Sequence, residues 1–68
     1  MSVAPVAEKL ALSIEEFCRS HGISRAKFYL LRDEGRAPRL MKIGTRTLIS
    51  VEAAAEWRRR MEEASTPA

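Results

Sequence analysis

The 68-residue chain has one cysteine and one histidine, Cys18 and His21. These two residues cannot supply a disulfide or a four-ligand zinc site, so no bridge or metal compensates for the small size. No apolar run approaches the roughly 18–20 residues of a membrane span. The first eleven residues also lack the basic start and long apolar stretch of a secretory signal. We therefore expect one small soluble cytoplasmic domain that uses no metal and no other cofactor and does not contact a membrane.

Catalytic groupings are missing as well. Most enzymes enclose their substrate between larger layers of structure than a chain of this length supplies. The sequence shows no nucleophile–base pair and no paired carboxylates that could share a pocket. We therefore expect no catalytic residues and a role other than catalysis.

Positive charge, in contrast, is concentrated in one part of the chain. Twelve Lys and Arg residues against nine Asp and Glu residues give a net charge of +3. Residues 19–46 hold eight basic and two acidic residues, a net charge of +6, so the remainder carries −3. This asymmetry is typical of a domain that lays one face on a polyanion, although composition alone fits an ordinary solvated surface equally well.

Two short helices joined by a turn give the clearest structural signal. Ser13 and Glu16 form a capping box for a first helix that runs to about residue 20 and ends before Gly22. Ser24 caps a second helix over residues 25–34. The pattern predicts a helix-turn-helix.

A β-hairpin is predicted over residues 40–49, around Gly44. A three-residue loop would place Met41, Ile43, Thr47 and Ile49 on one face, whereas a two-residue loop would split the two isoleucines between faces. We expect the three-residue loop, because one face has to pack on the helices.

Ser50 caps a last helix that begins at Val51 and runs to about residue 63. Its apolar stripe comprises Ala53, Ala54, Trp57 and Met61. The predicted core residues are Trp57, Phe17, Phe28, Leu31, Ile43 and Ile49. The predicted organisation is a flexible arm over 1–11, a domain over 12–63 and a flexible tail over 64–68.

The second helix of a helix-turn-helix enters the DNA major groove and reads bases with its N-terminal residues. When Phe28 and Leu31 face the core, the helical period points Ala26, Tyr29, Leu30 and Asp33 outward. Arg25 can reach guanine, Ala26 or Leu30 can contact a thymine methyl, and Ser24 and Lys27 suit phosphates. The hairpin tip and the residues around Pro38 add further cations for the backbone or minor groove. The candidate DNA-contacting residues are Ser24, Arg25, Ala26, Lys27, Tyr29, Leu30, Arg36, Arg39, Lys42, Thr45 and Arg46.

Structural explanations exist for several of these residues. Arg25 can be a neutral surface residue, and Tyr29 can be half-buried packing. Lys42 and Arg46 can protect a sheet edge from aggregation. The Arg58–Arg60 run is interpreted as a solvated helix face, and Cys18 and His21 as structural residues.

The order helix, turn, helix, two-stranded wing, helix resembles the small AlpA/excisionase-type DNA-binding proteins, a winged-helix branch related to the DNA-binding domain of MerR regulators. The resemblance covers about residues 12–60. It rests on Leu12–Glu16, Gly22–Arg25, Phe28–Tyr29, Glu34–Pro38, Lys42–Gly44 and Glu52–Trp57. It implies a mainly α winged helix-turn-helix of bacterial, phage or mobile-element origin, with the recognition helix on residues 24–34 and the wing on residues 42–46.

The sequence therefore predicts a double-stranded DNA-binding protein. The resemblance implies a transcription regulator or an excisionase-type recombination factor that works with an integrase or RNA polymerase. We expect a monomer, or a weak cooperative oligomer on DNA, with affinity that falls steeply as salt rises. The alternative is a protein-interaction module of the same fold, an integrase accessory or a regulator partner, that uses the exposed Tyr29–Leu30 pair.

Overall fold

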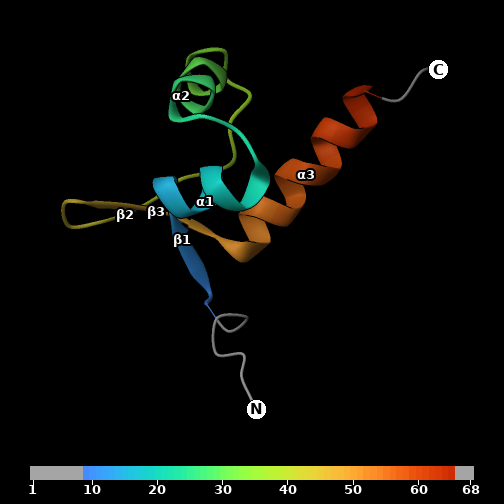
Figure 1. Cartoon of the computed structure of the whole chain (residues 1–68). Coiled ribbons are helices and arrows are strands. Elements are labelled where there is room, and N and C mark those ends of the chain that lie inside the picture. The colour runs from blue at the N-terminus through green and yellow to red at the C-terminus, as the bar shows by residue number, and fades with distance from the viewer. Residues whose placement is uncertain (1–8, 66–68) are drawn as a thin grey trace.

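The structure, a computed structural model, describes residues 9–65 and contains three helices and a three-stranded antiparallel sheet (Figure 1). Its elements in chain order are β1 Ala11–Ser13, α1 Ile14–His21, α2 Arg25–Asp33, β2 Met41–Ile43, β3 Arg46–Ser50 and α3 Val51–Ser65. The strands lie in the order β1-β3-β2. The fold is therefore mixed α/β rather than mainly α. None of the helices within residues 9–65 is long and apolar enough to cross a membrane.

The helix boundaries follow the predicted caps. The Ser13 hydroxyl accepts the backbone N–H of Glu16 at 3.0 Å, and the Glu16 carboxylate accepts the N–H of Ser13 at 2.9 Å, which completes the capping box. Gly22 closes α1 with a φ of 70°, a left-handed conformation that glycine adopts without strain. Only Gly22–Ser24 separates α1 from α2, so the predicted pair of helices joined by a short turn is present.

Strand β1 is absent from the predicted organisation. Ala11, expected in the flexible arm, lies in β1 and pairs with Ser50 of β3. The carbonyl of Leu10 accepts the backbone N–H of Val51 at 3.0 Å. The ordered part of the chain therefore begins before residue 12, because these residues complete the backbone hydrogen bonding of β3.

The chain ends also differ from the predicted boundaries. Helix α3 continues through Ser65, so residues 64–65 are helical rather than part of a flexible tail. The rest of the predicted arm, residues 1–8, and of the tail, residues 66–68, lies outside the described residues.

The hairpin register differs from the prediction. Ile43 pairs with Arg46 and Met41 pairs with Leu48, so the loop contains only Gly44 and Thr45. Gly44 has a φ of 61°, which suits a two-residue hairpin loop. The expected three-residue loop is therefore wrong, and the two isoleucines lie on opposite faces of the sheet.

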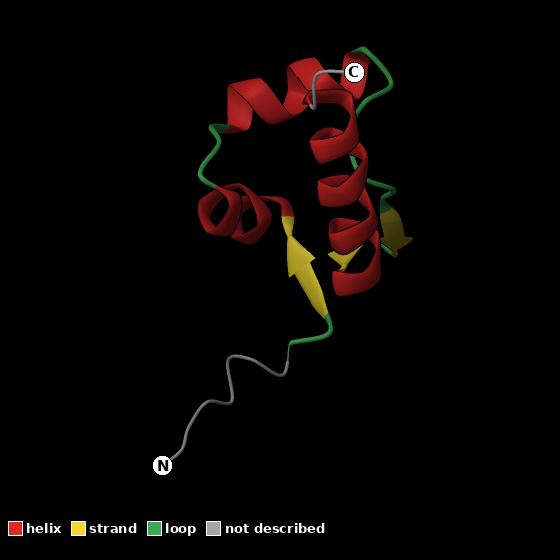
Figure 2. Cartoon of the chain, turned by 90° about the vertical axis from the view of Figure 1, so that its right-hand side faces the viewer, coloured by secondary structure: helices red, strands yellow, loops and turns green. Residues whose placement is uncertain are grey.

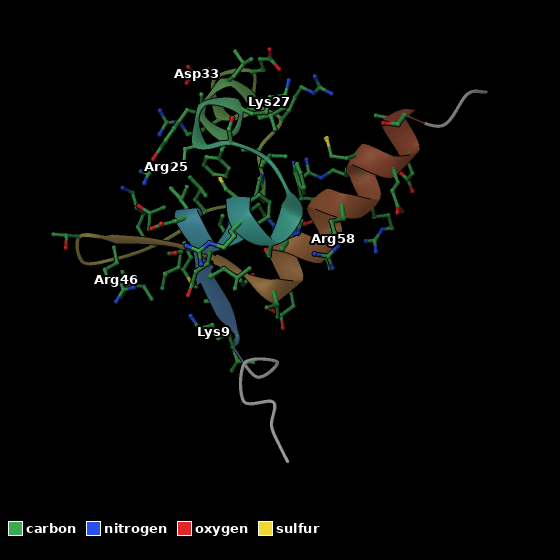
Figure 3. The ribbon with its side chains drawn as sticks, in the orientation of Figure 1. Lys9, Arg25, Lys27, Asp33, Arg46 and Arg58 are labelled. Atoms are coloured by element: carbon green, nitrogen blue, oxygen red, sulfur yellow. The ribbon has the colours of Figure 1, made fainter. Side chains whose placement is uncertain are left out.

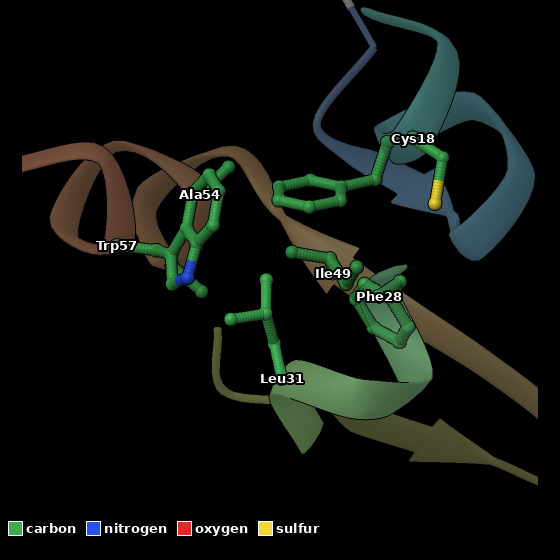
Figure 4. Packing of buried hydrophobic residues seen from close by; sticks show 8 residues of the cluster. Cys18, Phe28, Leu31, Ile49, Ala54 and Trp57 are labelled. Atoms are coloured by element: carbon green, nitrogen blue, oxygen red, sulfur yellow. The ribbon is translucent and has the colours of Figure 1, made fainter. Parts of the chain in front are cut away.

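The core lies where α1, α2 and α3 meet the inner face of the sheet, and a close view shows its packing (Figure 4). Its buried residues are Phe17, Cys18, Phe28, Leu31, Ile49, Ala53, Ala54 and Trp57. The predicted stripe on α3 is confirmed, with Met61 partly buried against the core. Ile43, predicted in the core, is 55% exposed because of the hairpin register, whereas Ile49 is fully buried opposite Leu12 of β1.

The elements are spread so that two of them protrude from this core. The β2–β3 hairpin extends to one side of the helices in Figure 1, and α2 lies above the sheet in the same view. Turned by 90°, α3 runs beside β1 and partly in front of the more distant strands (Figure 2). The outer side of α2 and the hairpin tip are therefore left open to solvent.

Candidate nucleic-acid interface

Helix α2 presents the outward face that its helical period predicts. Phe28 and Leu31 are buried in the core, and Tyr29 is half-buried. The side chains of Arg25, Ala26, Lys27 and Leu30 are exposed. No described part of the chain therefore covers the outward face of the N-terminal half of this helix.

The start of α2 is more positive than the start of the other helices. The first turns of α1 and α3 contain acidic residues, whereas that of α2 contains none and instead carries Arg25 and Lys27. Ser24 caps the helix, because its hydroxyl oxygen accepts the backbone N–H of Lys27 at 3.0 Å. The positive end of the helix dipole and two cations therefore share one exposed surface.

Tyr29 packs against its own helix, as one of the two interpretations of this residue expects. Its ring lies edge-on to Phe28 at 5.5 Å between centroids, and the Arg32 guanidinium lies 4.9 Å from the Tyr29 centroid. Arg32 also pairs with Asp33 at 3.7 Å. These contacts hold Tyr29 at the edge of the exposed face.

The hairpin tip carries Lys42, Thr45 and Arg46, all exposed. Lys42 pairs with Thr47 and Arg46 pairs with Ile43, so alternation along the strands puts the two cations on opposite faces of the hairpin. The hairpin therefore carries one cation on each face near its tip. Figure 3 shows Arg25 on α2 and Arg46 on the hairpin.

The cations of residues 19–46 fall into two groups. Arg36 pairs with Glu34 at 3.5 Å and Arg39 pairs with Glu56 of α3 at 2.9 Å; Arg19 and Arg32 have acidic partners as well. Within residues 9–65, four cations of this segment have no ion pair. They are Arg25, Lys27, Lys42 and Arg46.

This division separates the predicted contacts. The unpaired cations are those predicted for the second helix and the hairpin, whereas Arg36 and Arg39, predicted to neutralise the DNA backbone, already have carboxylate partners. Exposed ion pairs of this kind contribute only about 0–1 kcal/mol, so a phosphate could displace them. The four cations without an ion pair among the described residues can contact a phosphate without giving up a carboxylate partner.

Arg58, on the predicted solvated face of α3, has a specific contact that the sequence did not indicate. Its guanidinium lies 3.0 Å from Nε2 of His21, and Nδ1 of His21 lies 2.9 Å from the Phe17 carbonyl. The His21 ring stacks on Phe17 at 4.1 Å. The arrangement fits a neutral imidazole that donates from Nδ1 and accepts at Nε2, and it joins the end of α1 to α3.

Sequence reasoning also missed an apolar surface on the outer face of the sheet. Met41 and Ile43 are 37% and 55% exposed, and Leu48 beside them is partly exposed. The sequence signal for this surface is the alternation of side chains along β3. The length of the hairpin loop decides which of these side chains face outward, and the sequence left that length open. We call Met41, Ile43 and Leu48 the outer sheet patch.

Comparison with protein-family models, with curated proteins and with solved structures finds no match for this chain.

A shallow hollow beside α1 is lined by Lys9, Leu12, Glu16, Arg19 and Ser20. None of the predicted DNA-contacting residues lines this hollow. The candidate interface on α2 and the hairpin therefore lies apart from this hollow.

Proposed function

We propose that this protein binds double-stranded DNA in a sequence-specific manner through a winged helix-turn-helix formed by α1, α2 and the β2–β3 hairpin. One observation supports it most directly. Arg25 and Lys27 of α2, with Lys42 and Arg46 of the hairpin, are exposed and lack ion pairs among the described residues. Unpaired cations on two protruding elements suit the phosphates that border a groove.

In this proposal the N-terminal half of α2 enters the major groove. The exposed start of the helix carries Arg25 and Lys27, whereas at its end Asp33 and Glu34 pair with Arg32 and Arg36. Phosphates therefore attract the start of the helix more strongly than its end, so the N-terminal half of α2 lies closest to the bases. Arg25 is long enough to donate two hydrogen bonds to a guanine.

The hairpin supplies the second contact. Because Lys42 and Arg46 lie on opposite faces, the tip between them fits beside a phosphate strand or into the minor groove better than one flat face does. Arg39, paired with Glu56, helps to position the segment that joins α2 to the hairpin.

The resemblance to AlpA/excisionase-type proteins suggests the biological role. We propose a bacterial or phage transcription regulator, or a recombination factor that works with an integrase. A single domain of this size buries little DNA surface, so specificity would come from repeated sites or from a partner protein.

The direct test is a titration of labelled duplex at several salt concentrations. With Arg25 on a base, phosphate contacts by Lys27, Lys42 and Arg46 predict that log K falls by about 2.7 for each tenfold rise in salt, at about 0.9 per contact. Lys27→Ala and Lys42→Ala should each lower that slope by about 0.9. Arg60→Ala, an exposed arginine of α3, is the matched control and should leave the slope unchanged.

A salt-independent titration would contradict DNA binding. So would a pair of lysine variants whose slopes match that of the wild-type protein. Circular dichroism of each variant separates a lost contact from a lost fold.

A protein-interaction module remains the second candidate, and two exposed apolar features favour it. Leu30 is 49% exposed on α2, and the outer sheet patch is exposed on the hairpin. Aliphatic anchors of this kind are common at interfaces. Under this alternative Leu30→Lys would leave the DNA titration unchanged while abolishing the binding of a protein partner.

A further inference from the structure

The middle of the exposed face of α2 is apolar. Ala26 and Leu30 lie one turn apart, so their Cβ atoms are about 5–6 Å from each other on the same face. Leu30 is 49% exposed, and within the described chain neither residue belongs to the core or packs against it. We call these two residues the α2 apolar strip.

Cations border this strip on both sides. At about 100° per residue, Ala26 and Leu30 lie between Arg25 and Lys27 around the helix axis. Neither cation has an ion pair among the described residues. A helix held in a groove by its flanking cations therefore turns its apolar strip toward the base edges.

Only one apolar group projects from base edges into the major groove. It is the C5-methyl group of a pyrimidine, present in thymine and in 5-methylcytosine and absent from uracil and cytosine. Leu30 lies five residues beyond Arg25, about 7.5 Å along the helix. For a helix that lies along the groove, this rise corresponds to about two base steps of 3.4 Å.

We propose that the α2 apolar strip selects DNA sites that carry a pyrimidine C5-methyl group within about two base steps of the guanine contacted by Arg25. This inference rests on the proposed function, because it requires α2 to lie in the major groove. It assigns to Leu30 and Ala26 a choice of base, whereas Lys27 contributes affinity alone.

The experiment starts with selection of the preferred site from a random duplex pool. Each thymine of that site is then replaced in turn by deoxyuridine, which removes only the methyl group. At one position the affinity of the wild-type protein should fall about fourfold, which corresponds to about 0.8 kcal/mol for one buried methyl group. At the same position 5-methylcytosine should bind about fourfold more tightly than cytosine.

Two variants assign the effect to the strip. Leu30→Ala shortens an exposed side chain and should bind the thymine and deoxyuridine duplexes equally. Lys27→Ala is the matched control: it should bind both duplexes more weakly and keep the fourfold ratio between them.

The possible failures are distinguishable. A selected site at which no deoxyuridine replacement changes affinity would overturn the methyl assignment and leave DNA binding intact. A fourfold ratio that survives in Leu30→Ala would overturn the role of the strip. The absence of any selected sequence would overturn the proposed function and this inference together.

Discussion

The indole nitrogen of Trp57 donates a hydrogen bond to the backbone carbonyl of Arg36 at 2.8 Å. Trp57 is 7% exposed and lies edge-on to Phe17, with ring centroids 5.1 Å apart. One side chain of α3 thus contacts α1 and also fixes the segment that leads from α2 to the hairpin. The relative placement of the two proposed DNA-contacting elements depends on this residue.

Trp57→Phe should lower the free energy of unfolding by about 1–3 kcal/mol, because the carbonyl of Arg36 loses its partner. Trp57→Ala should cost about 3–5 kcal/mol, because it also leaves a cavity. Urea denaturation followed by circular dichroism measures both changes. Tryptophan fluorescence cannot be used, because both variants remove the only tryptophan of the sequence. An unchanged midpoint for Trp57→Phe would show that the hydrogen bond contributes nothing.

The two isoleucines of the hairpin should respond differently to truncation. Ile49→Ala should destabilise the fold by about 2–5 kcal/mol, because the side chain is fully buried. Ile43→Ala should change stability by no more than about 0.5 kcal/mol, because Ile43 is exposed. Equal losses in the two variants would favour the three-residue loop that the sequence suggested.

Glu16 should make stability depend on pH in the acid range. The Lys9 ammonium, followed by the backbone N–H of Ser13, lowers the pKa of Glu16 from 4.5 to about 2. The folded state therefore favours the ionised carboxylate. This stabilisation is complete above pH 4.5 and is lost as the pH falls towards 2.

Thermal melts between pH 2 and pH 5 test this expectation. Glu16→Gln should flatten the fall in stability that the wild-type protein shows in this range. Glu63→Gln, near the end of α3, removes one carboxylate without touching a cap and should keep the wild-type slope. A Glu16→Gln variant as pH-dependent as the wild type would refute the assignment.

Cys18 should react slowly with thiol reagents in the native protein. Burial raises the pKa of its thiol, and the charge of Arg25 opposes that shift. The sulfur lies 3.8 Å from the Ser24 carbonyl, inside the turn between α1 and α2. Because the thiolate is the reactive form, modification at pH 8 should be roughly tenfold or more slower in the native protein than in urea. Equal rates would indicate that the turn opens freely.

Arg25 and Lys42 should affect DNA binding in different ways. Arg25→Ala should cost about 1–3 kcal/mol at the preferred site and relax the choice of base. Lys42→Ala should weaken all sequences about equally, because a phosphate contact carries no sequence information. Competition between selected and random duplexes distinguishes the two effects, and identical specificity profiles would contradict this division.

Features that depend on neighbouring residues were predictable from the sequence. The serine caps at residues 13, 24 and 50 and the glycine that ends α1 at residue 22 are where the sequence predicts them, because capping bonds join residues only three or four apart. The same holds for the buried face of α2, which follows from its helical period. The exposure of Arg25, Ala26 and Leu30 is a consequence of that period.

Features that join distant segments were decided by the tertiary structure alone. Both hairpin loop lengths satisfy the local sequence, and pairing with β1 sets Leu12 opposite Ile49 and so buries that isoleucine. Likewise, only the packing of α3 brings Glu56 to Arg39, whereas within residues 9–65 Arg25, Lys27, Lys42 and Arg46 have no ion pair. Strand register and ion pairing depend on contacts between residues far apart in the chain, and no local pattern contains that information.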